Sequence, residues 1–97
     1  MRVAVPSSGR TLESPIDPRF GRSPYYIIVD TETMEHEVLD NTRMSAPGGV
    51  EAAQLVAGED VDVVLAGALG PNSSKVLSRA GIKIIKGVRG TVKEAIE

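Results

Sequence analysis

The chain has 97 residues, a net charge of −2 and no cysteine, with 41% hydrophobic and 25% charged residues. This length suits one domain, placed over residues 1–97, and the composition is that of an ordinary soluble globular protein. The charge and the 3% aromatic content argue against nucleic-acid binding. The lack of cysteine excludes disulfides, thiol catalysis and thiolate ligation of a metal or cluster.

The N-terminal residues predict a strand rather than a targeting segment. Residues 2–6 are a short apolar run ending at Pro6, without the long apolar stretch of a signal peptide. No run approaches the ~20 apolar residues that a membrane-spanning helix needs. We therefore expect a cytoplasmic protein without a membrane partner, which the absence of cysteine also allows.

A long loop follows, up to residue 24, and loops longer than about 12–15 residues are usually functional or disordered. It contains the run Asp17-Pro18-Arg19-Phe20-Gly21-Arg22, with two arginines and the only phenylalanine. Arginine suits bidentate contact with carboxylates and oxyanions. One interpretation is therefore a ligand-binding loop. The other is a structural ion pair of Arg19 or Arg22 with Asp17 or Asp30, with the phenylalanine anchoring the loop to the core.

The next two elements form a predicted β-hairpin. Residues 25–31 and 35–41 are rich in strand-forming side chains and are joined by a three-residue turn. The outer strand, 35–41, is expected to be an exposed sheet edge. A second loop covers residues 42–49, and a helix is predicted from about 49 to 58, where Gly58 ends it.

The only histidine, His36, lies in this hairpin between two glutamates. Strand alternation places Glu35 and Glu37 on one face and His36 on the other. A metal site built from these three residues is therefore a weak hypothesis, and a surface histidine is the favoured interpretation.

The C-terminal half alternates strands and helices. The continuous apolar run at 61–66 predicts a strand covered on both faces. A helix follows from Pro71 to Gly81, then a strand at 82–86. Thr91 and Glu94 form a capping box that begins the last short helix. The order β, β-hairpin, α, β, α, β, α predicts a mixed five-stranded sheet with helices on both faces.

Ligands of open α/β sheets bind beyond the carboxyl ends of the parallel strands. Three loops are expected there: residues 7–10, 67–70 and 87–90. The last two lead into helix N-termini, which favour anions. The pattern Gly67-x-x-Gly70 is weak support by itself, because a tight strand-to-helix turn also needs glycine.

Arginine is the only basic residue type before position 75. Most of these arginines lie in or beside loops and could together form a pocket for an oxyanion or a metal cluster, although for each arginine alone solvated surface charge is the favoured interpretation. Catalysis has little support, because no nucleophile–histidine motif is present and Asp60 and Asp62 form no carboxylate cluster.

Almost the whole chain resembles the dinitrogenase iron–molybdenum cofactor biosynthesis family, which includes NifX-like proteins and the C-terminal domain of NifB. The most specific block is Asp17-x-Arg19-Phe20-Gly21-Arg22 with the strand that follows it. The other matching positions are Asn41, Gly48-Gly49, the run from Val61 to Gly67, Gly70, Gly81-Ile82 and Gly90-x-Val92-x-Glu94-Ala95.

The resemblance implies a ribonuclease-H-like α/β fold and a non-catalytic role. That role is to bind, carry or insert an iron–sulfur or molybdenum-containing cluster or its precursor, with a protein partner in cofactor assembly. Family members often place a histidine in the glycine-rich segment before the first helix, but residues 44–49 contain none. Any cluster would then be held without thiolates, by arginines and backbone N–H groups.

The alternative function is a small regulatory or interaction module that binds an anionic metabolite or a protein partner. An enzyme, such as a hydrolase or nuclease, is the least supported class. The candidate ligand-binding or cluster-binding residues are Ser8, Gly9, Arg10, Arg19, Phe20, Arg22, Arg43, Gly48, Gly49, Gly67 and Gly70, with His36 as a weak metal candidate.

Overall fold

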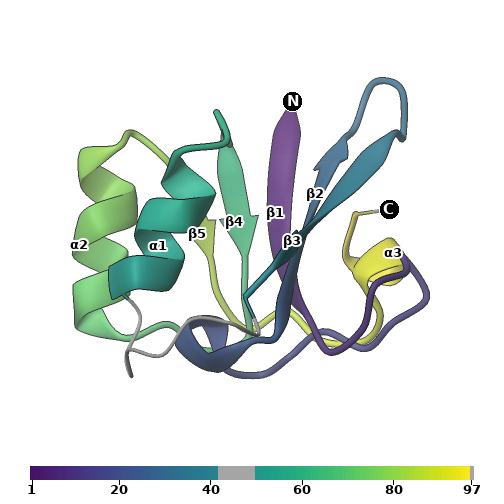
Figure 1. The fold of residues 1–97 in the computed structure, drawn as a ribbon, viewed down its shortest axis with the longest axis horizontal. Helices are drawn as coiled ribbons and strands as arrows, with labels where there is room; N and C mark the ends of the chain where they lie inside the picture. The colour runs from purple at the N-terminus through teal and green to yellow at the C-terminus, as the bar shows by residue number, and fades with distance from the viewer. Residues whose placement is uncertain (42–49, 97) are drawn as a thin grey trace.

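The computed structural model describes residues 1–41 and 50–96 and confirms the predicted mixed sheet (Figure 1). Its five strands lie in the order β3-β2-β1-β4-β5. Strands β1, β4 and β5 are parallel, and β2 is antiparallel to both of its neighbours. The strands are β1 (Arg2–Ser7), β2 (Tyr25–Asp30), β3 (His36–Asp40), β4 (Val63–Leu65) and β5 (Lys83–Ile85). The three parallel strands therefore end at the same side of the sheet, the lower side in Figure 1, called here the carboxyl edge.

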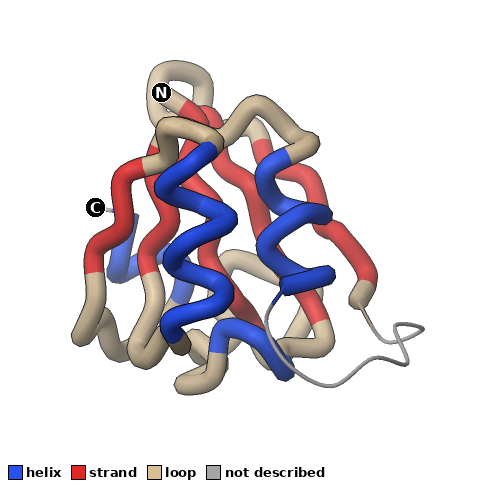
Figure 2. Tube along the Cα trace, turned by 90° about the vertical axis from the view of Figure 1, so that its left-hand side faces the viewer, coloured by secondary structure: helices blue, strands red, loops and turns tan. Residues whose placement is uncertain are grey.

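The helices cover both faces of the sheet, as expected. Helices α1 (Val50–Ala57) and α2 (Pro71–Arg79) lie side by side on one face (Figure 2), and α3 (Val92–Ile96) packs on the other. Each face has its own apolar cluster. Ala4, Ile28 and Val64 contribute to the cluster under α1 and α2, whereas their strand neighbours contribute to the cluster under α3. This two-sided burial explains the continuous apolar run of β4.

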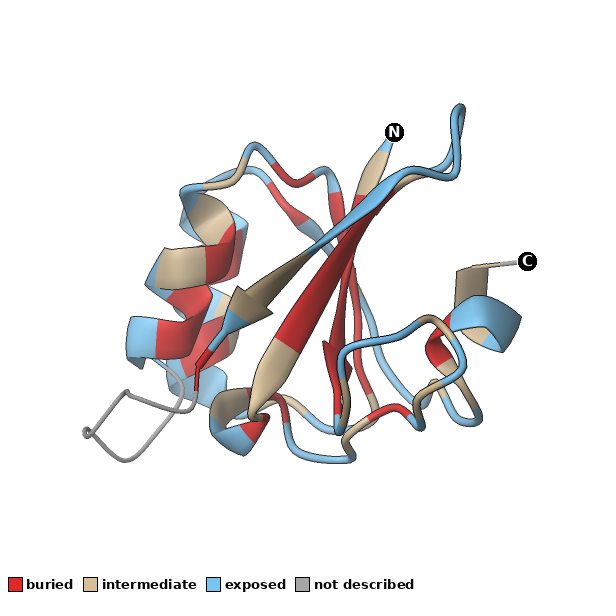
Figure 3. Ribbon diagram, turned by 45° about the vertical axis from the view of Figure 1, so that its right-hand side comes forward, coloured by how far each residue is buried: buried red, intermediate tan, exposed pale blue. Residues whose placement is uncertain are grey.

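Two peripheral features follow the sequence predictions. Strand β3 is an edge strand, and its residues are exposed or only partly buried (Figure 3). The capping box of α3 is present, since Thr91 N donates to Glu94 Oε1 at 3.1 Å and Glu94 N donates to Thr91 Oγ1 at 3.2 Å. Within residues 1–41 and 50–96, the predicted strands and α-helices differ from the observed ones by a few residues at their ends.

The long loop after β1 is more ordered than its length suggests. It contains a short 3-10 helix, η1 (Phe20–Arg22), and isolated β-bridges join Ser7 to Ile16, Pro15 to Thr91 and Arg19 to Ala68. The loop therefore runs along the carboxyl edge, beside the segments that follow β4 and β5.

Tyr26 of β2 ties this loop to the core. Its ring is fully buried, lies 5.1 Å from the Phe20 ring between centroids, and its hydroxyl donates a hydrogen bond to the Phe20 carbonyl oxygen. Burial raises the pKa of the Tyr26 hydroxyl well above its ordinary value, and the nearby Asp17 carboxylate raises it further. The neutral phenol is therefore the form that the folded protein stabilises.

This pKa shift predicts a loss of stability at high pH. An unfolded tyrosine ionises near pH 10, whereas folded Tyr26 stays protonated, so the unfolded state releases a proton that the folded state keeps. The free energy of unfolding should then fall above about pH 10, by at most about 1.4 kcal/mol per pH unit from this residue. Urea unfolding of the native protein and of Tyr26→Phe between pH 8 and 11 measures the difference in slope. Equal slopes would contradict the prediction.

Candidate functional site

The segment from Asp17 to Arg22 is fastened at the carboxyl edge by short-range and long-range hydrogen bonds. Asp17 Oδ1 accepts a hydrogen bond from Arg19 N at 2.9 Å, which closes a local turn. Phe20 N donates to Ala68 O at 3.2 Å, and Ala68 N donates to Pro18 O at 3.1 Å. The Phe20 side chain is 1% exposed, in the apolar cluster that also contains buried residues of α1. The predicted anchoring role of Phe20 is therefore present in the structure.

Arg19 and Arg22 do not form the ion pairs that were the alternative interpretation of this loop. The Asp17 carboxylate accepts a hydrogen bond from the backbone N–H of Arg19, and Asp30 Oδ1 accepts a hydrogen bond from Glu32 N at 2.9 Å. Both arginines are exposed, and neither has an ion-pair partner within residues 1–41 and 50–96. Their guanidinium groups are available to an anion.

The other candidates after β1 have different surroundings. The guanidinium carbon of Arg10 lies 5.3 Å from the centre of the Tyr25 ring, a cation–π contact. Ser8 donates to Pro15 O through both its N, at 3.0 Å, and its Oγ, at 3.1 Å. A Cβ at Gly9 would lie 2.5 Å from Ser14 Oγ. These contacts give Ser8 and Gly9 a structural role in folding the loop back on itself.

The two glycines after β4 differ from one another. A Cβ at Gly67 would lie 3.4 Å from Pro18 Cα and 3.6 Å from Val88 O, so the residue allows three segments to approach closely. A Cβ at Gly70 would meet no atom within 4 Å, and Gly70 precedes α2 without a side-chain cap. Gly70 therefore adds no side chain at the N-terminus of α2, which has no side-chain cap among the described residues. The candidates Arg43, Gly48 and Gly49 lie outside the described residues.

The second predicted helix start on this edge, that of α3, is closed. In addition to the capping box, Val92 N donates to Ser14 O at 3.0 Å and Lys93 N donates to Leu12 O at 2.8 Å. The N–H groups that were expected to attract an anion are occupied by carbonyl oxygens of the long loop, so this expectation is wrong.

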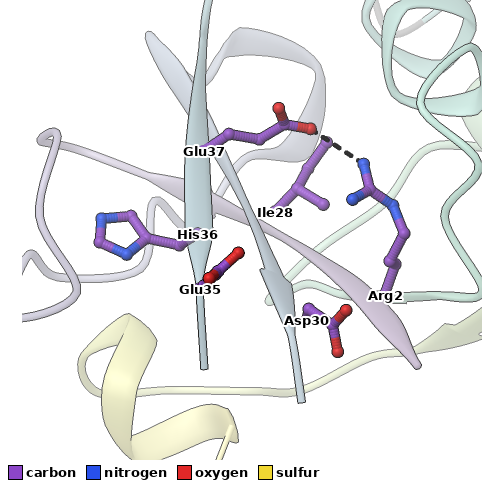
Figure 4. A pocket seen from close by; sticks show the side chains of 6 residues that line it. All are labelled: Arg2, Ile28, Asp30, Glu35, His36 and Glu37. Atoms are coloured by element: carbon purple, nitrogen blue, oxygen red, sulfur yellow. Dashed lines mark hydrogen bonds and ion pairs between the residues drawn. The ribbon is translucent and has the colours of Figure 1, made fainter. Parts of the chain in front are cut away.

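The surroundings of His36 do not resemble a metal centre. A polar hollow of about 150 Å³ is lined by Arg2, Ile28, Asp30, Glu35, His36 and Glu37. Figure 4 shows the His36 ring directed away from the Glu37 carboxylate, as alternation predicted, while Arg2 forms an ion pair with Glu37 at 2.9 Å. No group of three or more His, Asp or Glu side chains suited to a metal occurs among the described residues. A metal at His36 stays a prediction without structural support.

A larger hollow, of about 470 Å³, lies at the carboxyl edge itself. It is lined by Ile16, Pro18, Gly67, Ala68, Gly87, Val88, Arg89 and Gly90. The sequence predicted that the two glycine-rich loops would meet here but did not include Arg89 or the apolar residues of the long loop. The sequence pattern that could have identified Arg89 is its position between two glycines in a strand-to-helix loop. Both glycines have positive φ, +77° at Gly87 and +95° at Gly90.

The chain matches the family described as "Dinitrogenase iron-molybdenum cofactor" over residues 1–97. No curated protein matches it. The apo form of the orange protein from Desulfovibrio gigas is 36% identical, with a TM-score of 0.91 over 98% of this chain and 82% of that chain. A NifB-type protein from Thermotoga is 41% identical, with a TM-score of 0.84 over 98% and 83% of the two chains.

A dinitrogenase-type protein from Methanocaldococcus jannaschii shares the fold at 19% identity, with a TM-score of 0.71 over 99% of this chain and 84% of that chain. These likenesses agree with the mixed sheet and its helices. In the part of the chain that the structure describes, none of the helices has the length and apolar character needed to cross a membrane.

Proposed function

This chain belongs to the dinitrogenase iron–molybdenum cofactor family, and from that membership we propose that it is a non-catalytic carrier of a metal cluster. Its cargo would be an iron–sulfur or molybdenum-containing cluster, or a precursor of one, passed to a protein partner during cofactor assembly. The cargo would rest at the carboxyl edge, on the loop from Asp17 to Arg22.

The observation that carries this proposal is the state of Arg19 and Arg22. Both are exposed and without an ion-pair partner in the described structure, yet the loop that bears them is fastened to the core through Phe20. A fastened loop presents charge with less loss of conformational freedom on binding than a free one. Guanidinium groups bind anions through charge and directed hydrogen bonds, which a cysteine-free chain needs in place of thiolates.

The N-terminus of α2, which has no side-chain cap among the described residues, lies on the same edge and adds backbone N–H groups that favour an anion. The role is proposed as non-catalytic because arginines, glycines and backbone amides bind anions without serving as general acids or bases near neutral pH. Asp62, a conceivable base, instead accepts a hydrogen bond from Arg2 N at 2.8 Å.

Anaerobic reconstitution tests the proposal. The protein is incubated with iron and sulfide, with tetrathiomolybdate, or with all three, and is then desalted, and the retained metal is measured together with visible absorbance. We expect at least one arm to leave a metal cluster on the folded chain but not on the chain unfolded in urea. Loss of all metal in every arm would overturn the carrier function.

A thermal-shift screen separates the alternative function from this one. The same guanidinium groups could serve an anionic metabolite, in which case nucleotides or small organic anions would raise the melting temperature without metal. Under the carrier proposal, the reconstituted protein should melt at a higher temperature than the metal-free protein, while metabolites alone have no effect. Stabilisation by a metabolite together with loss of all metal would favour a regulatory module.

A further inference from the structure

The loops that follow β4 and β5 leave the carboxyl edge in opposite directions. The loop after β4 leads to α2 on one face of the sheet, and the loop after β5 leads to α3 on the other (Figures 1 and 2). Where neighbouring parallel strands diverge in this way, a crevice opens beyond the strand ends, and α/β proteins commonly bind small ligands in it. The hollow of about 470 Å³ lies between these two loops.

The size and lining of this hollow suit a small organic molecule. Its volume falls within the roughly 300–1,000 Å³ of typical ligand sites, which are mostly apolar with a few polar groups. Ile16, Pro18 and Val88 supply apolar side chains. The glycines of the lining expose backbone instead of side chains, so the space is not filled from within.

A single charged side chain, that of Arg89, lines the hollow. Arg89 is exposed, and it has no ion-pair partner among the residues that the structure describes. The adjacent N-terminus of α3 offers no further anion site, because the N–H groups of residues 91–94 are already hydrogen-bonded. The hollow therefore offers one guanidinium group, which matches one carboxylate.

We propose that this hollow is a binding site for a small organic carboxylate. The apolar part of the ligand contacts Ile16, Pro18 and Val88, and its carboxylate pairs with Arg89. The site requires neither the Arg19 nor the Arg22 side chain, so its existence is independent of the proposed cargo.

Titration of the metal-free ¹⁵N-labelled protein with hexanoate, followed by NMR, tests this site. Acetate lacks the apolar chain and 1-hexanol lacks the charge, so the three probes separate the two contributions. We expect saturable shifts of the amide resonances of Gly67, Ala68, Gly87 and Val88 with hexanoate, and affinities at least about 10-fold weaker for acetate and hexanol. Equal affinities for the three probes, or hexanoate shifts located elsewhere, would overturn the proposal.

Two arginine variants complete the test. Arg89→Gln should weaken hexanoate binding by about 10-fold or more, because a charged hydrogen-bonding partner is removed. Arg79→Gln removes the same charge from the last turn of α2 and should leave the affinity unchanged. Spectra of both variants without ligand report whether they are folded. An unchanged affinity in folded Arg89→Gln, or an equal loss in both variants, would refute a specific carboxylate contact.

Discussion

Replacing Phe20 by alanine is expected to lower the free energy of unfolding by about 3–5 kcal/mol. The side chain is 1% exposed, contacts the Tyr26 ring and lies in the apolar cluster beneath α1 and α2. Removing the ring leaves a cavity that the surrounding strands and helices fill only in part. Urea unfolding followed by circular dichroism measures the change.

A matched variant of Phe20 separates the effect of losing apolar volume from the effect of losing the aromatic ring. Phe20→Leu keeps most of the apolar volume and should cost less than half as much as the alanine variant, about 1–2 kcal/mol. The alanine variant keeps the backbone hydrogen bonds of residue 20 to Ala68 and to the Tyr26 hydroxyl, so its effect measures the contribution of the ring alone to holding the arginine-bearing loop. A loss below about 1 kcal/mol for alanine would show that Phe20 is not the anchor.

The second large effect is expected on the binding of the metal cluster, when Arg19 and Arg22 are both replaced. The double variant Arg19→Gln/Arg22→Gln is expected to bind the cluster at least roughly 100-fold more weakly, and therefore to lose most of it on desalting, because each of the two arginines contributes a charged hydrogen bond of about 1.5–3 kcal/mol. Its free energy of unfolding should stay within about 0.5 kcal/mol of the native value, since both side chains are exposed and without ion pairs in the described structure.

The control for this experiment is Arg79→Gln/Lys83→Gln. It removes two positive charges from the end of α2 and the beginning of β5, away from the carboxyl edge. The control should retain as much cluster as the native protein. An equal loss in both double variants would mean that net charge, and not this loop, governs retention, and full retention by Arg19→Gln/Arg22→Gln would place the cargo elsewhere.

The experiments on the two proposed sites are independent of each other. Loss of the arginines at positions 19 and 22 should not change hexanoate binding by more than about 2-fold, and Arg89→Gln should not release the cluster. If both expectations hold, the chain has two separate ligand sites. If each change affects both ligands, the entire carboxyl edge forms one site.

Most of the secondary structure could be predicted from the sequence because its signals are local. The apolar run of β4, Pro71 at the first position of α2 and the Thr91–Glu94 capping box each involve residues within one element. The face occupied by His36 was also predictable, because side chains alternate along any strand. The meeting of the glycine-rich loops at one edge followed from the parallel crossovers alone.

What the side chains and N–H groups of that edge actually contact was decided by the tertiary structure. Sequence spacing offered Asp17 and Asp30 as partners for the arginines, but local turns bind both carboxylates to backbone N–H groups instead. The N-terminus of α3 looked open to an anion, but carbonyl oxygens of Leu12 and Ser14, which are about 80 positions away in the sequence, accept hydrogen bonds from its N–H groups. The hollow beside Arg89 is completed in the same way, because tertiary packing places Ile16 and Pro18 of the long loop against the two glycine-rich loops. Local patterns thus determined which elements form and in what order, whereas long-range hydrogen bonds decided which charges at the carboxyl edge remain available.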